Sequence, residues 1–235
     1  MPDSGDTARE VVTALEALSS ETEREKIRKR LRPGEEVIGV RMRHLFDLSK
    51  ANVDLPLDEV QRLMDEPDYE PRLTAFCILD FKARRRGLDD DARRVLYEMY
   101  LDNHDRITSW DMVDRAAPWV VGGHLAGRSL EPLRRLARDD DPLRRRTAMT
   151  APLYFVKKGS DEDLAGGFAI AAMLVSDPDP IVCKPVGIFL KHAGTKGPDS
   201  LRDFLAEHAA SMPRPSLRLA IEKLDPAERK RWLGR

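Results

Sequence analysis

The stretch DPLRRRTA at residues 141–148 shares a pattern with DPDPIVCKPVG at residues 177–187, at an offset of 38 residues. Both copies place an acid and a proline before a basic residue, which is Arg146 in the first and Lys184 in the second. Proline suits the first turn of a helix, where its missing N–H would have no intrahelical partner. Each copy therefore predicts a turn followed by a helix, and a looser third copy begins at Glu70.

Almost every segment around these copies has helical rather than strand periodicity. Apolar residues recur three and four positions apart, and runs of alternating β-branched residues are absent. The pattern predicts an all-α chain. The clearest predicted helices cover Thr7–Leu18, Val37–Leu48, Tyr69–Phe81, Asp91–Tyr100, Leu143–Val156 and Pro198–Ala210.

The predicted helical hairpins begin near residues 35, 69, 105, 140 and 177, a spacing typical of helical solenoids. An acid, a proline turn and an inward-facing basic residue resemble the habit of HEAT repeats. We therefore expect a curved α-solenoid of HEAT-like helical hairpins with a concave face free for a large ligand. The expected single domain spans residues 1–235, with capping helices over 1–33, repeats over 35–212, and a C-terminal helix and polar tail over 213–235.

The composition excludes wholesale disorder, because hydrophobic residues are 41% and charged residues 34% of the 235 positions. The longest apolar run, Leu164–Val175, is too short to cross a bilayer, and we expect no contact with membranes. The N-terminus has no basic start or apolar segment that would indicate a signal peptide. Cys77 and Cys183 form no metal-binding spacing with the scattered histidines, so we expect a reduced cytoplasmic protein without a metal site.

Charge is segregated along the chain although the net charge is only −1. Residues 180–235 hold 11 Lys and Arg against 6 Asp and Glu, whereas the remainder of the chain is acidic. A basic region on an acidic body can form a local surface for anions. The alternative is an ordinary solvated helical face.

The usual signatures of nucleotide hydrolases, metalloproteases and α/β-hydrolases are missing, but ITSWDMVD at residues 107–114 combines an aromatic residue with carboxylates. Thr108 or Ser109 could cap a helix there, with Asp111 in its first turn. Trp110 and Asp114 are four residues apart and would share a face of that helix.

Two interpretations of this motif remain open from the sequence. In the first, Met112 and Val113 face the core while the tryptophan and Asp114 face solvent. In the second, Trp110 packs against the neighbouring hairpin and Asp114 pairs with Arg115 or Arg146, since large aromatic side chains are usually buried.

Four separate stretches, in order, resemble the AlkD-type DNA alkylation-repair family of HEAT-like-repeat DNA glycosylases. The similarity covers roughly residues 30–225. The matching stretches are EEVIGVRMRHLFDLSK at 35–50, HDRITSWDMVDRAAPWVVGGHL at 104–125, RRRTAMTAPLYFVKKG at 144–159 and LRDFLAEHAASMPRPSLRLAIEKLD at 201–225.

The resemblance implies a monofunctional glycosylase that removes cationic N3- or N7-alkylated purines from double-stranded DNA. The family's catalytic tryptophan and aspartate fall on Trp110 and Asp114, and its cleft arginine falls on Arg146. No cofactor is implied, and nothing in the sequence demands more than a monomer, which would associate with the nucleoid when bound to DNA. The candidate DNA-binding residues are Arg146, Arg41, Arg43, Lys50, Lys184, Lys191 and Arg214.

The chain departs from the family at Ile188, which stands where the second cleft tryptophan is expected. Phe189 is a possible cleft aromatic if Pro185 rotates the start of the helix, although core packing is the simpler interpretation. The departure permits ordinary activity, a cleft for bulky adducts, or DNA binding without catalysis. A repeat scaffold for a protein partner is a further alternative, favoured by the near-neutral net charge.

Overall fold

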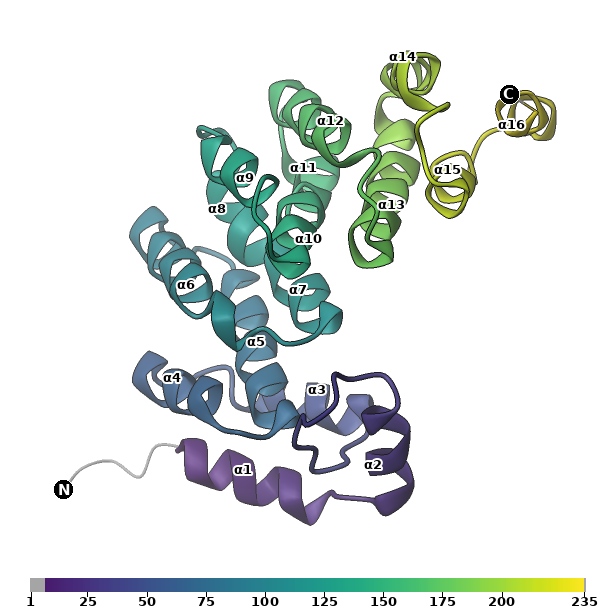
Figure 1. Ribbon diagram of the computed structural model, residues 1–235. Helices are drawn as coiled ribbons and strands as arrows, with labels where there is room; N and C mark the ends of the chain where they lie inside the picture. The colour runs from purple at the N-terminus through teal and green to yellow at the C-terminus, as the bar shows by residue number, and fades with distance from the viewer. Residues whose placement is uncertain (1–6, 235) are drawn as a thin grey trace. The chain divides into compact units, whose positions relative to one another are not determined.

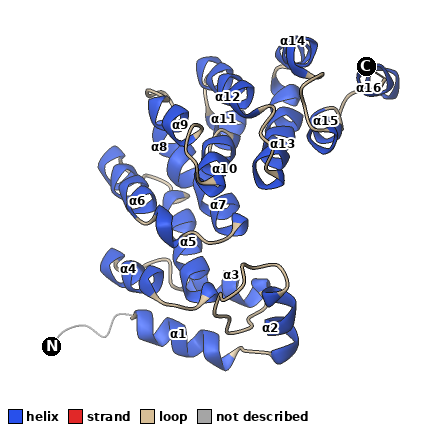
Figure 2. Cartoon of the chain, in the orientation of Figure 1, coloured by secondary structure: helices blue, strands red, loops and turns tan. Residues whose placement is uncertain are grey.

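The computed structural model describes residues 7–234, which form helices joined by turns and loops (Figure 1, Figure 2). No strand occurs in this range, where an isolated backbone bridge joins Glu36 to Asp68. The prediction of an all-α chain of helical repeats is confirmed, whereas the predicted curvature stays a prediction. Of the helices between residues 7 and 234, none combines the length and apolar character that a bilayer crossing requires.

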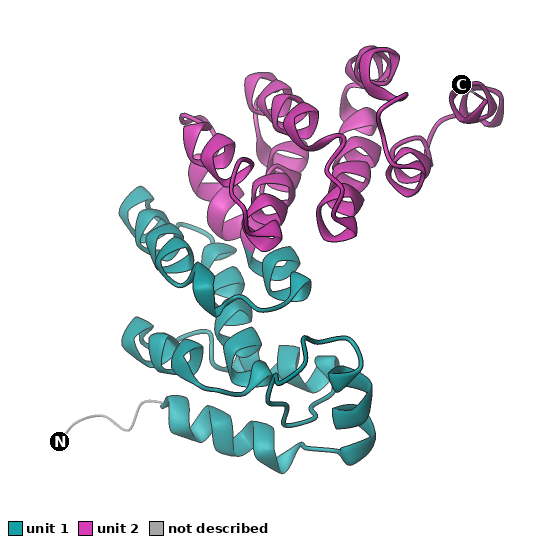
Figure 3. Ribbon diagram, in the orientation of Figure 1, with its two compact units in different colours: residues 1–116 teal, residues 117–235 magenta. Residues whose placement is uncertain are grey.

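The chain divides into two compact units, residues 1–116 and 117–235 (Figure 3). We describe each unit by itself, and the prediction that they form one continuous repeat domain stays a prediction. Residues 1–6 of the predicted N-terminal cap and Arg235 of the predicted tail lie outside the described residues.

The first unit is organised around helix α5, which packs against α1, α3, α4 and α6. Nearly every side chain of α5 is buried, from Tyr69 at its start to Asp80 in its last turns. The predicted cap contributes α1 and α2. The helices are α1 (Ala8–Ala17), α2 (Glu21–Arg28), α3 (Met42–Ala51), α4 (Leu57–Asp65), α5 (Tyr69–Ala83), α6 (Asp90–Asp102), the short 3-10 helix η1 (His104–Arg106) and α7 (Trp110–Ala117).

A buried carboxylate explains why the helix predicted from Val37 begins only at Met42. Glu70 of α5 is fully buried and accepts hydrogen bonds from the backbone N–H groups of residues 38, 39 and 40 at 2.8–3.2 Å. Gly39 also has a φ of 96°, which L side chains rarely adopt. Residues 37–41 are therefore an extended segment that packs against α5, and the prediction that they are helical is wrong.

The second unit is centred on helix α13, which packs against α10, α11, α12, α14 and α15. Its elements begin with a π-helical segment, η2 (Pro118–Gly122). The helices that follow are α8 (Gly123–Leu125), α9 (Glu131–Leu136), α10 (Pro142–Thr150), α11 (Leu153–Lys158), α12 (Asp161–Leu174), α13 (Pro180–Lys196), α14 (Pro198–His208), α15 (Arg214–Ala220) and α16 (Pro226–Leu233).

The repeated acid–proline motif starts α10 and α13 in the same way. Asp141 accepts the backbone N–H of Leu143 at 2.9 Å, and Asp179 accepts that of Ile181 at 2.9 Å. Each aspartate is the N-cap and the proline after it is the first helical residue. The prediction that both copies begin helices is confirmed.

Three local features of the second unit refine the sequence predictions. The single helix predicted over Leu143–Val156 is two helices, α10 and α11, which meet at Pro152. Gly122 serves close packing, because a Cβ there would lie 2.1 Å from the carbonyl oxygen of Ala151. The predicted polar tail is itself the helix α16, anchored by the buried Trp232.

Candidate functional site

Helix α7 separates an exposed aromatic face from a buried apolar one. Trp110, its first residue, is 42% exposed, and the half-buried Asp114 follows one turn later. Met112 and Val113 are fully buried, as predicted from their spacing. The exposed tryptophan favours the interpretation in which Trp110 and Asp114 share the outer face of the helix.

The carboxylate of Asp111 accepts several hydrogen bonds at the start of α7. Its Oδ2 accepts from Arg30 Nη1 and from the hydroxyl of Tyr69, each at 2.5 Å. Its Oδ1 accepts from the hydroxyl of Ser109 and from the backbone N–H of Met112. From its position, Asp111 is predicted only to be a first-turn carboxylate, and nothing in its spacing indicates Arg30 or Tyr69 as partners.

The two hydroxyl groups before α7 have different partners. Ser109, which directly precedes the helix, donates to Asp111, whereas Thr108 donates to Glu35 at 2.8 Å. Glu35 also pairs with the partly buried Arg72 of α5. These hydrogen bonds connect the loop before α7 to the first turn of that helix and to the segment before α3.

Arg115 of α7 pairs with Asp80 of α5. Its Nη2 lies 2.9 Å from Oδ2 of the fully buried Asp80. The guanidinium also lies between the rings of Phe46 and Phe81, 4.7 and 4.5 Å from their centroids. Arg115 therefore anchors the inner side of α7 to α3 and α5.

A small pocket of about 190 Å³ lies beside the Arg30–Tyr69 pair in the first unit. Its walls combine three charged side chains with the tyrosine and an apolar floor. The lining residues are Glu23, Lys26, Ile27, Arg30, Val40, Met42, Leu45, Tyr69 and Leu73.

In the second unit, Arg146 of α10 is buried and contacts α13. It is only 3% exposed, and its Nη1 donates to the carbonyl oxygen of Ile181 in the first turn of α13. Its neighbour Arg145 pairs with Asp177 at 2.7 Å. Arg145 and Arg146 thus contact the start of the next repeat, and a phosphate contact by Arg146 stays a prediction.

One face of α13 carries Lys184, Ile188 and Lys191 at helical spacing. Lys184 is exposed and Ile188 is half-buried. The side chain of Lys191 is 17% exposed, and its Nζ lies 3.4 Å from Oε2 of Glu222. The position expected for a second tryptophan therefore lies between two lysines.

Phe189 belongs to the core, which corrects its assignment as a possible cleft aromatic. It is fully buried, and its ring centroid lies 5.6 Å from that of Phe168 in an edge-to-face contact. Pro185 cannot rotate the start of the helix as supposed, because α13 already begins at Pro180. A Cβ on Gly167 would also lie 2.6 Å from the Phe189 ring, which shows how tightly the ring is enclosed.

The basic candidates of the first unit lie on α3 or at its start, and all are exposed. The side chain of Arg41 is 66% exposed and lies 3.4 Å from Glu23. That of Arg43 is 89% exposed and lies 3.9 Å from Asp47. Lys50 is exposed near the end of the helix. Solvated pairs of this kind contribute little to stability, which leaves these cations accessible to a polyanion.

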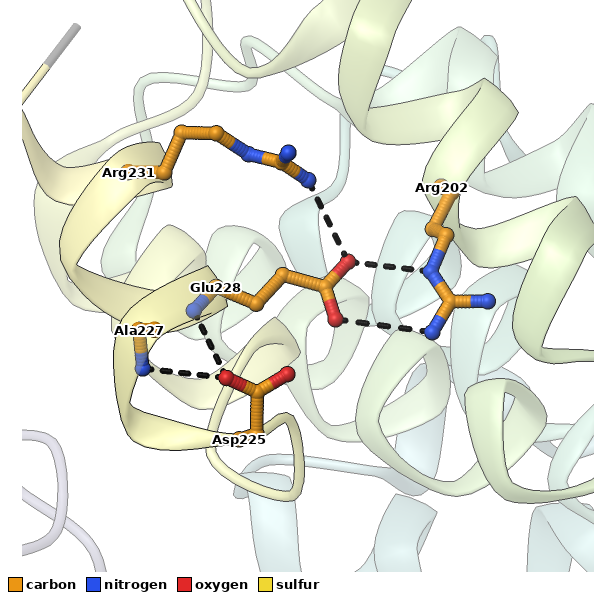
Figure 4. Close-up of a pocket in the computed structure, with 5 residues that line it drawn as sticks. All are labelled: Arg202, Asp225, Ala227, Glu228 and Arg231. Atoms are coloured by element: carbon orange, nitrogen blue, oxygen red, sulfur yellow. Dashed lines mark hydrogen bonds and ion pairs between the residues drawn. The ribbon is translucent and has the colours of Figure 1, made fainter.

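In the pocket drawn in Figure 4, which has a volume of about 460 Å³, the basic and acidic side chains pair with one another. Arg202 donates to both carboxylate oxygens of Glu228, at 3.0 and 3.4 Å, and Arg231 lies 3.6 Å from the same carboxylate. Nearby, the exposed Arg214 donates to the carbonyl oxygen of Leu233 at 3.0 Å. These contacts hold α16 against α14 and α15.

Comparison with known proteins assigns the chain to a family. Residues 11–224 match the family model described as DNA alkylation repair enzyme. The chain belongs to that family. A search of curated proteins found no significant match. Membership supports a DNA repair role with DNA as the partner, and it covers both compact units.

Proposed function

We propose that this member of the DNA alkylation repair family is a monofunctional glycosylase. It hydrolyses the N-glycosidic bond of cationic N3- or N7-alkylated purines in duplex DNA. The observation that carries the proposal is the exposed Trp110 with Asp114 one turn away on α7, the two residues on which the family's catalytic tryptophan and aspartate are expected to fall. The protein acts as a cytoplasmic monomer that joins the nucleoid when bound to DNA.

The chemistry asks for the side chains that α7 supplies. An alkylated purine cation already has a weakened glycosidic bond and leaves as a neutral base, so little general-acid catalysis is needed. Asp114 stabilises the positive charge that develops on the sugar and orients the attacking water. Trp110 offers its face to the cationic base or the sugar edge, an attraction between a cation and a ring quadrupole.

Basic side chains bind the DNA backbone, and all of them are exposed except the partly buried Lys191. In this proposal the phosphate contacts come from Arg41, Arg43 and Lys50 in the first unit, and from Lys184, Lys191 and Arg214 in the second. Phosphate contacts of this kind position the duplex without reading its sequence. Arg146 supports the repeat packing that places α13, since its guanidinium is buried against Ile181.

The test measures free base released from duplex DNA that carries 7-methylguanine or 3-methyladenine. We expect release by the wild-type protein and a loss on the order of 100-fold or more with Asp114→Asn, at unchanged DNA affinity. Asp58→Asn, an exposed carboxylate in the first turn of α4, serves as the matched control. Equal release by wild type and Asp114→Asn would remove Asp114 from the mechanism.

Ile188 favours a second candidate function, DNA binding without base release or action on bulky adducts only. A half-buried aliphatic side chain between two lysines offers no π-face to a methylated base. Salt-sensitive DNA binding without release of either methylated base would select this candidate. Absence of both release and binding would leave a scaffold for a protein partner.

A further inference from the structure

Asp111 is held by donors from two segments that are distant in sequence. Arg30 lies 81 residues before it, just beyond the end of α2, and Tyr69 lies 42 residues before it at the start of α5. Both donate to the same carboxylate oxygen, Oδ2. The side chain of Asp111 is only 11% exposed, whereas that of Arg30 is 33% exposed.

The two donors also contact each other and complete a triangle. Arg30 Nη2 donates to the Tyr69 hydroxyl at 3.0 Å, and the guanidinium lies 5.4 Å from the centroid of the tyrosine ring. Burial and the charge of Asp111 raise the pKa of Tyr69, so the hydroxyl keeps its proton and remains a donor to the carboxylate. Charge-assisted hydrogen bonds of this type are short and directional.

This triangle lies directly beside the residues proposed to act on DNA. Asp111 follows Trp110 in the chain and precedes Asp114 by three residues, all within the first five residues of α7. The Trp110 side chain is 42% exposed, and the contacts that hold the first turn of α7 help to set its direction. One capping side chain can satisfy a backbone N–H group at the start of a helix. At the start of α7, the hydroxyl of Ser109 already donates to Asp111, so the contacts from Arg30 and Tyr69 come in addition.

We propose that Arg30 and Tyr69 are positioning residues that act through Asp111 to fix the directions of Trp110 and Asp114. The inference rests on the proposed function and gives the N-terminal helices a part in the active site beyond capping the repeats. The supporting groups of a reactive site commonly change its activity by 10–100-fold when removed, since misplacement by about 1 Å slows a reaction strongly.

The kinetic test uses Tyr69→Phe, which removes one hydroxyl and keeps the buried ring. We expect the kcat for base release to fall by about tenfold, with unchanged KM and DNA affinity. Arg30→Lys keeps the cation and should retain more activity than Arg30→Ala. Arg28→Ala, an exposed arginine of the same region, is the control and should release base at the wild-type rate. An unchanged kcat in Tyr69→Phe would overturn the inference.

A spectroscopic test does not depend on catalysis. Replacing Trp119 and Trp232 by phenylalanine leaves Trp110 as the sole tryptophan. Adding Tyr69→Phe to that protein should then change the acrylamide quenching and the fluorescence anisotropy of Trp110, while Arg28→Ala should change neither. Unaltered quenching and anisotropy would contradict the positioning role.

The two tests separate this inference from the proposed function. Base release by the wild type with a normal kcat in Tyr69→Phe would reject the positioning role and leave the glycosylase proposal intact. No base release by the wild type, together with a changed Trp110 signal, would reject the glycosylase proposal and support the coupling of Tyr69 to the start of α7. If the triple variant fails to fold, the kinetic comparison in the native sequence decides.

Discussion

At the scale of single residues, Arg115 stabilises the inner side of α7 through charge and stacking together. Asp80 is fully buried, and burial raises the pKa of its carboxyl against the opposing charges of Arg115 and Arg84. The Arg115 guanidinium contacts this carboxylate from between Phe46 and Phe81. Arg84 lies 2.8 Å from the same carboxylate, but its side chain is 39% exposed against 22% for Arg115.

We therefore expect Arg115→Ala to lower the free energy of unfolding by about 3 kcal/mol, because it leaves a buried carboxylate with one partly solvated partner. Arg84→Ala should cost about 1 kcal/mol, since water can replace much of its contact. Urea unfolding followed by far-UV circular dichroism gives both values. Equal losses in the two variants would show that stacking between the phenylalanines adds nothing.

The candidate site was predictable only where its residues are close in sequence. The four-residue spacing of Trp110 and Asp114 and the apolar pair between them predict which face of α7 is exposed. The partners of Asp111 are 81 and 42 residues away, and no local pattern encodes such hydrogen bonds. The burial of Arg146 was likewise not predictable from its motif. It follows from the packing of α13 on α10.

At the scale of helices, α13 places the partly buried imidazole of His192 near several positive charges. Burial lowers the pKa of His192 below its usual 6.5, and the charges of Lys223, Lys191 and Lys157 lower it further. Glu222 acts in the opposite direction. Protonating His192 in the folded protein thus places another cation among three lysines, from α11, α13 and the turn after α15.

The sign of the resulting pH dependence follows from linkage. Because the folded protein binds this proton less readily than the unfolded chain, His192 is neutral in both states above about pH 7 and has no effect there. As the pH falls through 6.5, the unfolded chain takes up the proton first and the free energy of unfolding falls.

We predict that His192→Gln reduces the loss of thermal stability between pH 7 and pH 5, whereas replacement of the exposed His44 by glutamine does not. The melting temperature at half-unit pH intervals measures the difference. Parallel pH profiles for wild type and His192→Gln would assign the acid sensitivity to other groups.

At the scale of the whole molecule, the repeat pattern was readable because it depends on short-range rules. Prolines and N-cap aspartates start α10 and α13, and apolar spacing defines most other helices. The errors lie where a tertiary contact overrides local preference. Glu70 holds the segment before α3 out of a helix by accepting its backbone N–H groups.

The segregation of charge leads to the last prediction, which concerns DNA binding by the entire chain. Residues 180–235 carry an excess of five positive charges, whereas the rest of the chain carries an excess of negative charge. If the exposed cations contact phosphates, the logarithm of DNA affinity falls linearly with the logarithm of salt concentration as counterions are released. Lys184→Gln and Arg214→Gln should each reduce that slope by about one.

Arg94→Gln, on α6 in the acidic part of the chain, should leave the slope unchanged, because this arginine pairs with Glu98 and Asp91. Fluorescence anisotropy of a labelled duplex between 50 and 200 mM salt, roughly the range in which phosphate contacts dominate, measures all three variants. Asp114→Asn should match the wild-type slope, since a residue that acts on the sugar releases no counterion. A flat salt dependence would deny the basic region its role and favour a protein partner over DNA.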